Sequence, residues 1–577
     1  MSSTATAVRL HKDTYLDSVV QLSGTRAMTQ SEGVKWASAA MATAANLETL
    51  REMGVEGPEL QGARANDLFL AVLAGTDEAA AAAIEAGEAA LFGAPARGDS
   101  VSAGDAARPA RSLAEAQDRL DGGGNVAIVS VPGPYAAIEA HKALTAGLHV
   151  LLFSDNVPLD EEVELKDRAR DLGLLVMGPG AGTAMLGGTG LGFANVVKPL
   201  SDQDEHCERS ERGERGEPGE RGERGEPSEP SEHGERGGRG AGPGGRGAGR
   251  VGVVAAAGTG AQEAMSLLDQ WGVGVSHVIG LGGRDLSEAV GGRMAIAAIE
   301  ALEADPHTDA ILLVSKPPAP DVARTVTSVA GVKPLVAALI GLAGPLDEAD
   351  AASRERTVTT APTLEQGVAA ALHSVGKVGP DPAAGLTEPV AAACRQLSTS
   401  AERRLIRGLF SGGTLCYEAL SLLSPLVGEV YSNTPIDKRW GLPAPAGSHM
   451  CLDLGEEEYT KGRPHPMIDP EARIELMRQA GAEPCVAVIL IDVVLGYGSH
   501  PDPAGLLAPV AREVMAGGDG PQVVAYVLGT EGDPQGLEDQ RRKLRDAGCI
   551  VPATAARAAL AAAALAIRKP DLVGALP

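Results

Sequence analysis

The 577-residue chain lacks the features that mark secreted, membrane-spanning or zinc-binding proteins. Its six cysteines are scattered without a Cys-x-x-Cys pair, so neither a disulfide framework nor a zinc site is indicated. No window approaches the roughly 18 uninterrupted apolar residues of a transmembrane helix. Residues 1–30 lack a basic start followed by an apolar run. We therefore expect a cytoplasmic protein with no metal centre and no membrane partner.

The chain also lacks an excess of basic charge. Lysine and arginine total 50 against 76 aspartates and glutamates, which leaves a net charge of −26 at pH 7. Such a charge repels phosphates at long range, so we expect no nucleic-acid partner. Any bound phosphate must be held by local groups. At about 150 residues per domain, the length predicts three or four domains.

A twelve-residue segment occurs twice, 155 positions apart, over 257–268 and 412–423. Each copy follows an apolar run, at 251–255 and 405–409, and predicts a strand, a glycine turn and an amphipathic helix. The free N–H groups and the positive end of such a helix favour an anion. The alternative is that the glycines serve only the turns. The predicted phosphate-binding residues are Gly258, Thr259, Gly260, Gly412, Gly413 and Thr414.

Glu263 and Glu418 occupy the same place in the two predicted helices. One interpretation is that both are solvated charges on a helix face. The other is that each orients an imidazole or accepts a substrate N–H near the anion site, and so belongs to the catalytic residues.

Short β-branched runs alternate with alanine-rich stretches, which is typical of α/β proteins with parallel sheets. Residues 1–110 predict a small α/β domain, with strands near 18–21 and 67–73. Residues 111–199 predict a Rossmann-like domain without a Gly-x-Gly-x-x-Gly turn, so ordinary NAD binding is not expected. Residues 200–250 are almost entirely Gly, Glu, Arg, Pro and Ser, which indicates a flexible insert. Two repeat-based domains then span 251–398 and 399–577.

A polar loop in the second repeat contains Lys461, Arg463 and His465. It lies directly before a helix that we expect to begin with Asp469 as N-cap and Pro470 as first residue. His465 stands between two prolines, which restrains it as a nucleophile or proton carrier needs, and the two cations would clamp a phosphoryl or carboxylate oxygen. The alternative is a surface loop with a hydrogen-bonded histidine.

Other polar residues of the two repeats are further candidates. The corresponding loop of the first repeat contains Arg284 and Asp285 but no histidine, and Lys316 and Asp492 are predicted just past strand ends, where ligands bind in open α/β folds. We predict that Arg284, Asp285 and Lys316 bind substrate. The repeats are predicted to stay in register beyond the helix, with Met294 facing Met467.

Several motifs resemble known proteins. Residues 113–183 resemble the CoA-binding domain of the succinyl-CoA synthetase α subunit, 251–263 are similar to its strand–Ser-Gly-Thr–helix element, and the second repeat resembles the carboxyl-terminal domain of the β subunit. Taken whole, the chain resembles the FdrA family of acyl-CoA-synthetase-like proteins. The resemblance implies a Rossmann-like domain followed by two flavodoxin-like domains. The motifs that carry it are 154–157, 280–286, 314–318, 462–470 and 533–535.

The chain departs from these relatives at several points. No ATP-grasp domain can be accommodated, and residues 341–345 contain no histidine where the α subunit carries its phosphorylated one. Gly180 and Ala181 replace an expected Asp-Cys pair. Because the usual CoA-holding glycine turn is also missing, CoA binding stays open and no cofactor is certain.

The resemblance implies a carbamoyltransferase component in allantoin breakdown, which converts oxalurate and phosphate to oxamate and carbamoyl phosphate. We favour this function because it needs no nucleotide site, with one turn holding phosphate and Lys461, Arg463 and His465 engaging oxalurate. One alternative is half of an NDP-forming acyl-CoA synthetase with an ATP-grasp partner. Another is a noncatalytic regulator that binds CoA or an acyl phosphate. Separate protein subunits are expected, and homo-oligomerisation stays open.

Overall fold

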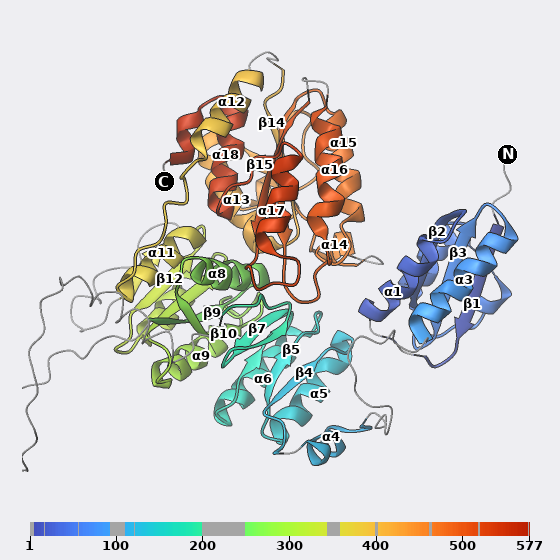
Figure 1. Cartoon of the computed structure of the whole chain (residues 1–577). Coiled ribbons are helices and arrows are strands. Elements are labelled where there is room, and N and C mark those ends of the chain that lie inside the picture. The colour runs from blue at the N-terminus through green and yellow to red at the C-terminus, as the bar shows by residue number, and fades with distance from the viewer. Residues whose placement is uncertain are drawn as a thin grey trace, which may run out of the picture. The chain divides into compact units, whose positions relative to one another are not determined.

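The computed structural model describes residues 5–14, 16, 18–55, 57–92, 110–120, 122–198, 249–342, 358–397, 402–460, 464–516, 520–574 and 576. They form two compact units (Figure 1). The first unit comprises Met1–Ala110 and Glu456–Asp469, and the second comprises Arg111–Gly455 and Pro470–Pro577. The predicted insert lies outside the described residues except for its last two positions, and Lys461 and Arg463 also lie outside them.

The first unit contains a three-stranded antiparallel sheet in the order β1-β3-β2. Alternate residues of β3 face two cores, one with α1 and α3 and one with α2, because helices cover both faces of the sheet. The predicted strand at 18–21 is wrong, since these residues begin α1. A short apolar run does not distinguish strand from helix. The elements are β1 (Ala5–His11), α1 (Ser18–Thr29), β2 (Val34–Met41), α2 (Ala44–Glu52), η1 (Pro58–Leu60), β3 (Leu68–Ala74), α3 (Asp77–Phe92) and, apart from these, α14 (Glu457–Thr460).

The second unit begins with a small parallel sheet in the order β4-β5-β6. Its helices α5 and α6 match the predicted Rossmann-like pattern within a few residues. The elements are α4 (Leu113–Arg119), β4 (Val126–Val129), α5 (Gly133–Thr145), β5 (His149–Leu152), α6 (Leu159–Asp171) and β6 (Val176–Met177).

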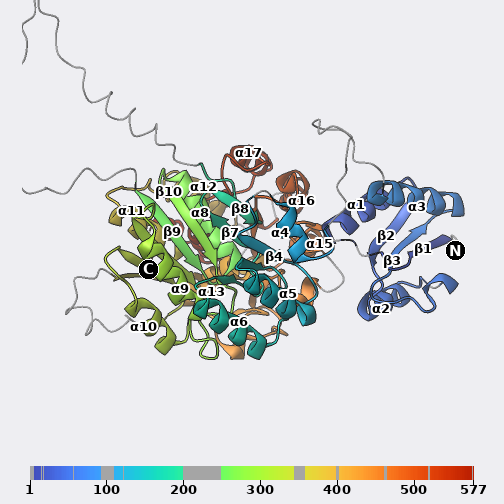
Figure 2. The ribbon, with the colours of Figure 1, turned by 90° about the horizontal axis from the view of Figure 1, so that it is seen from below.

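A seven-stranded sheet follows, in the order β13-β12-β11-β9-β10-β7-β8. Figure 2 shows β7, β9 and β10 side by side. The hairpin of β7 and β8 lies in the range predicted for the Rossmann-like domain, yet it pairs antiparallel with β10, so this sheet crosses the predicted boundary. The elements are β7 (Thr183–Leu186), β8 (Thr189–Gly192), β9 (Arg250–Ala255), α8 (Gly258–Gln270), β10 (Gly274–Gly280), α9 (Arg293–Ala304), β11 (Ala310–Ser315), α10 (Pro320–Ser328), β12 (Leu335–Leu339), β13 (Val358–Ala361) and α11 (Leu364–Ser374).

The second repeat forms a five-stranded parallel sheet in the order β15-β16-β14-β17-β18. All nine residues of β17 are buried, which is typical of a parallel strand covered on both faces. The elements are α12 (Thr387–Leu397), β14 (Leu405–Phe410), α13 (Gly413–Val427), β15 (Val430–Tyr431), η3 (Lys438–Trp440), β16 (His449–Asp453), α15 (Glu471–Ala482), β17 (Val486–Val494), α16 (Pro503–Met515), β18 (Gln522–Leu528), α17 (Leu537–Asp546), α18 (Ala555–Ile567) and η4 (Pro570–Gly574).

The two repeats share the flavodoxin-like strand order 2-1-3-4-5, counted from β9 in the first repeat and from β14 in the second, where the two-residue edge strand β15 is left out of the count. In the second repeat the parallel bridge between Val524 and Ile550 takes the fifth position. The predicted α/β class with this architecture is therefore confirmed. None of the helices within the described ranges is long and apolar enough to cross a bilayer.

The predicted register of the repeats holds only in part. β10 ends at Gly280 and β16 at Asp453, which keeps the expected offset. The helices do not keep it, because Met294 lies in α9 whereas Met467 precedes α15. Helix α15 begins at Glu471 with Pro470 at the N-cap, one residue later than predicted.

Candidate functional site

The two glycine turns lie in contact within the second unit. A Cβ placed on Gly412 would lie 2.2 Å from Cγ2 of Thr259, and one on Gly260 would lie 3.0 Å from Cγ2 of Thr414. Thr259 of the first turn therefore occupies the space beside Gly412 of the second turn, and Thr414 of the second turn occupies the space beside Gly260 of the first. Thr259 and Thr414 are 8% and 1% exposed. The first turns of α8 and α13, one from each repeat, are packed directly on one another.

Lys316 and Asp453 converge on the beginning of α13. Lys316 Nζ and Asp453 Oδ2 each lie 2.4 Å from the position that a Cβ on Gly413 would take. Lys316 follows β11 of the first repeat, and Asp453 ends β16 of the second. Lys316 is half-buried and Asp453 is buried. A cation and a carboxylate thus bracket the first residue of this helix. The sequence interpretation missed Asp453, although its place at a strand end was a usable signal.

The backbone N–H groups in the first turns of α8 and α13 receive no hydrogen-bond acceptor from an N-cap side chain. The N-cap residues, Ala257 and Gly412, make no side-chain capping bond. The hydroxyl oxygen of Thr414 is buried and has no hydrogen-bond partner among the described residues. Free N–H groups, the positive helix end and the neighbouring ammonium group of Lys316 all favour a bound anion here.

A buried ion pair holds the α13 turn in place. Arg473 Nη1 lies 2.8 Å from Asp492 Oδ1, and both side chains are 1% exposed. Asp492 also accepts hydrogen bonds from the backbone N–H and the hydroxyl of Ser411, directly before the turn. Burial raises the pKa of Asp492, and Arg473 opposes this shift. Asp492 was predicted just past a strand end, but it lies within β17, where this pair is enclosed.

The two glutamates are not solvated. Glu263 and Glu418 are each 1% exposed, so the interpretation as solvated helix-face charges is wrong. Glu418 Oε1 accepts a 2.7 Å bond from the N–H of Leu364, the first residue of α11. Glu263 accepts from the N–H of Ala555, the first residue of α18, at 3.5 Å and from the Tyr526 hydroxyl at 2.5 Å. Each glutamate therefore caps a helix of the other repeat.

Burial also sets the protonation of these glutamates. It is the largest cause that raises the pKa of Glu263 to about 7 and that of Glu418 to about 8. The charge of Glu263 raises the pKa of Glu418 further, because the two carboxyl groups are neighbours. Neither group was found to face the α13 turn, and a direct catalytic role for them stays a prediction.

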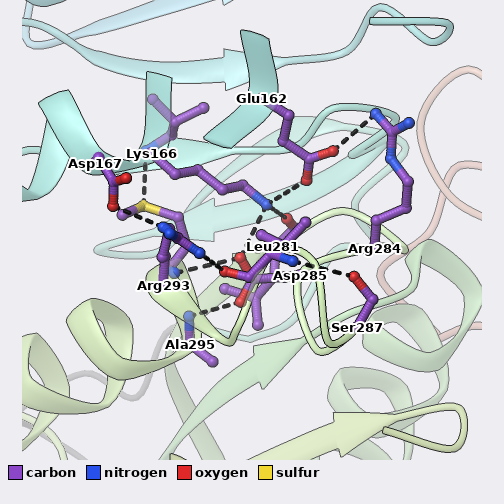
Figure 3. Close-up of polar contacts among 12 residues, drawn as sticks. Glu162, Lys166, Asp167, Leu281, Arg284, Asp285, Ser287, Arg293 and Ala295 are labelled. Carbon is purple, nitrogen blue, oxygen red and sulfur yellow. Dashed lines mark hydrogen bonds and ion pairs between the residues drawn. The ribbon is translucent and has the colours of Figure 1, made fainter. Parts of the chain in front are cut away.

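Arg284 and Asp285 take part in an ion network with α6 (Figure 3). Asp285 is fully buried, accepts a 2.9 Å bond from Lys166 Nζ and caps α9 at the N–H of Ala295. Arg284 Nη2 lies 2.7 Å from Glu162 Oε2, and Lys166 bridges Glu162 and Asp285. These side chains join the Rossmann-like part to the loop after β10. Their predicted contact with substrate stays a prediction.

His465 lies in the first unit. Its Nδ1 accepts a hydrogen bond from the N–H of Met467 at 3.3 Å, and its carbonyl accepts from Ile468 and Asp469. These bonds fix the loop between the two prolines, as the sequence indicated. The expected approach of His465, Lys461 and Arg463 to the turns stays a prediction.

The first turn of α5 does not offer an open diphosphate cradle for CoA. A Cβ on Gly133 would lie 2.2 Å from the carbonyl oxygen of Asp155 and 2.7 Å from that of Asn156. The chain's own backbone therefore crosses this turn, where Rossmann-type proteins hold a diphosphate. We assign no step to CoA on this geometry.

Comparisons with known proteins agree with this architecture. A CoA-ligase family model matches residues 254–373 and 409–565, and a model of the AllF heavy metal-associated domain matches residues 1–108. The uncharacterized protein YahF of Escherichia coli (strain K12) is 36% identical over 562 residues, which cover 95% of this chain and 96% of YahF.

Solved structures are similar only at low identity. The dinucleotide-forming acetyl-coenzyme A synthetase 1 of Ca. Korarchaeum cryptofilum is 15% identical, with 79% of this chain and 86% of that chain covered and a TM-score of 0.25. ATP citrate lyase of Methanothrix soehngenii, in complex with citrate and coenzyme A, is 16% identical, with 44% and 35% covered and a TM-score of 0.25.

The donor groups of residues 1–108 do not fit a heavy-metal site. This range contains no cysteine and only one histidine, His11. Its Nε2 lies 3.1 Å from Glu88, and its ring packs on Phe92. Soft metal ions need thiolate or several imidazole ligands, so we assign no metal to this domain.

The full-length similarity to YahF and the CoA-ligase match over both repeats show the family. The chain belongs to the FdrA family of acyl-CoA-synthetase-like proteins, within the succinyl-CoA synthetase-like superfamily.

Proposed function

We propose that the chain is a subunit of an oxamate carbamoyltransferase, which transfers a carbamoyl group between oxalurate and phosphate. One observation carries the proposal: two helix N-termini meet, and Lys316 and Asp453 flank Gly413 at one of them. This arrangement offers donors and a cation for a phosphate beside a carboxylate acceptor.

The proposed site distinguishes the two ends of carbamoyl phosphate. The N–H groups at the start of α13 and Lys316 would bind the phosphate oxygens. Asp453 would accept a hydrogen bond from the carbamoyl NH₂ group. Asp453 already accepts a 3.0 Å bond from the N–H of Gly455, and an acetyl group has no N–H to donate, so it would forgo a second bond to this carboxylate that is worth about 1.5–3 kcal/mol. The site therefore favours a carbamoyl over an acyl phosphate.

The proposed reaction is a displacement at the carbamoyl carbon. An oxygen of phosphate attacks this carbon and forms the new C–O bond. The C–N bond to the oxamate nitrogen then breaks, and the nitrogen takes the proton that the phosphate loses. Proton transfer by His465 and binding of the oxalurate carboxylate by Lys461 and Arg463 stay predictions from the sequence. In this scheme Glu263 and Glu418 position α8 and α13.

A second candidate is half of an NDP-forming acyl-CoA synthetase. The CoA-ligase match over both repeats favours it. An acyl phosphate would then occupy the same turns, and a separate subunit would supply the nucleotide site. CoA and phosphate would be the substrates.

One assay separates the two candidates. The full chain, alone and with its neighbouring gene products, is incubated with oxalurate and phosphate, or with succinate, CoA and ATP. We expect carbamoyl phosphate without nucleotide, and a loss of at least about tenfold in Lys316→Ala. The matched control is Lys377→Ala, whose half-buried side chain donates to the carbonyl of Gly272 and lies outside the turns. Thioester formation that requires CoA and ATP, without carbamoyl phosphate, would exclude the favoured function.

A further inference from the structure

One cavity of the second unit has no role in the site described above. It measures about 420 Å³ and lies among the loop before α12, helix α17 and the segment that leads into α18. It shares no lining residue with the glycine turns. The volume is within the range of small-molecule sites, roughly 300–1,000 Å³.

Two arginines of α17 line this cavity. Arg541 and Arg545 are four residues apart, so they lie on the same face of the helix. The chain carries a net charge of −26, and a cavity lined by two cations differs from its average surface. Arg545 is exposed, and its Nη1 lies 2.5 Å from Glu538.

Arg541 has one side-chain nitrogen that makes no hydrogen bond within the described residues. Its Nη2 donates to Gln270 at 3.1 Å, and its Nε is buried with no partner among the described residues. Burial is the largest cause that lowers the pKa of Arg541, and the charge of Arg545 adds to this effect. An anion between the two guanidinium groups would accept hydrogen bonds from them and reduce the repulsion between them, which Glu538 and Glu531 already offset in part.

The remaining walls are mostly apolar. They include Leu386, Pro389, Ile550 and Pro552. Cys549 also lines the cavity, and burial raises the pKa of its thiol to about 12, so it stays neutral beside an anion. An inorganic ion would leave these apolar walls without contact, whereas an organic anion would cover them.

We propose that this cavity binds a small organic anion, with its phosphate or carboxylate between Arg541 and Arg545 and its apolar body against Leu386, Pro389 and Ile550. The site is distinct from the carbamoyl-transfer site proposed above and does not depend on it.

The test is calorimetric titration of the full chain with phenyl phosphate, benzoate and inorganic phosphate. We expect an aromatic anion to bind more tightly than inorganic phosphate, and the tighter of the two aromatic anions identifies the charged group. In the double variant Arg541→Gln/Arg545→Gln, its affinity should fall at least about tenfold. Arg542→Gln is the matched control, because Arg542 lies on the same helix, pairs with Asp539 and does not line the cavity.

Chemical labelling of the unaltered chain provides a second measurement. Phenylglyoxal modifies accessible guanidinium groups, and peptide mapping assigns each modified arginine. The bound anion should protect Arg541 and Arg545 but not Arg542. Three results would overturn the proposal: no binding of either aromatic anion at millimolar concentration, an equal loss in Arg542→Gln, or absence of protection. Binding should persist in Gly413→Ala, since a loss there would assign the anion to the glycine turn.

Discussion

A single methyl group at Gly412 is expected to separate the two turns. The backbone of Gly412 is extended, with φ −153° and ψ 141°, so alanine adopts it without strain. The added Cβ would nevertheless lie 2.2 Å from Cγ2, 2.7 Å from Oγ1 and 3.0 Å from Cβ of Thr259. Rotation of Thr259 about Cα–Cβ would move Cγ2 and Oγ1 but would leave its Cβ in place at 3.0 Å.

The cost of Gly412→Ala follows from this geometry. Thr259 is β-branched and buried, so its side chain has few other positions. Helices α8 and α13 must therefore move apart, and overpacking of this kind costs about 1–3 kcal/mol. Thr259→Ala removes two of the three clashing atoms, so the double variant should recover about 1–2 kcal/mol of that cost.

Urea unfolding of the full chain measures this coupling. Trp271 follows α8 directly and reports on the second unit once Trp36 and Trp440 are replaced by phenylalanine. The four members of the cycle are the parent chain, Gly412→Ala, Thr259→Ala and the double variant. If Gly412→Ala costs the same free energy in both threonine backgrounds, the two turns are not in contact and the proposed centre is absent.

Three further outcomes follow from the same contacts. Gly413→Ala meets the flexible end of Lys316 and the buried carboxylate of Asp453, so it should cost no more than about 1–3 kcal/mol of unfolding free energy but lower carbamoyl phosphate formation at least about tenfold; a fully active variant would contradict the site. The pKa of Glu263 is raised from 4.5 to about 7, so the folded chain keeps a proton that the unfolded chain releases, and this residue makes stability fall as pH rises between these values. Glu263→Gln should therefore gain on the order of 3 kcal/mol relative to the parent between pH 4 and pH 8 in urea unfolding, and an unchanged pH profile would refute this. Lys166→Met leaves the buried carboxylate of Asp285 without a cation and Glu162 with Arg284 as its only charged partner in the described network, so it should cost about 3–5 kcal/mol in the same measurement, whereas a neutral effect would show that the network is dispensable.

Local signals explain what the sequence predicted correctly. The turns before α8 and α13 follow from a glycine between an apolar run and an amphipathic segment, all within a few neighbouring residues. The strand order of the repeats follows from the alternation of strands and helices together with the resemblance. The strand at 18–21 failed because four residues are too few to reveal a period.

Nonlocal contacts explain what the sequence did not predict. The partners of Glu263 and Glu418 lie in α18 and α11, far away in the chain, and no short pattern encodes a cap supplied by another repeat. Asp285 was predicted to bind substrate because a polar loop after a strand is typical of sites. Its carboxylate accepts a hydrogen bond from Lys166 of α6, a contact that no short pattern encodes, and its role in substrate binding stays a prediction. Asp453 has the same strand-end placement and lies beside the turn. Placement alone therefore does not show which groups a strand-end carboxylate contacts.

The exchanged caps connect the fold to the proposed chemistry. Glu263 of the first repeat caps α18 of the second, and Glu418 of the second caps α11 of the first. Each repeat alone would therefore leave the first N–H of one helix without its glutamate acceptor, although the N-cap side chains of Thr363 and Thr554 would still cap α11 and α18. The same two helices, α8 and α13, begin at the turns that contact one another, and Lys316 reaches α13 from the other repeat. A phosphate site at Gly413 thus requires both repeats, because the donors belong to one and the cation to the other.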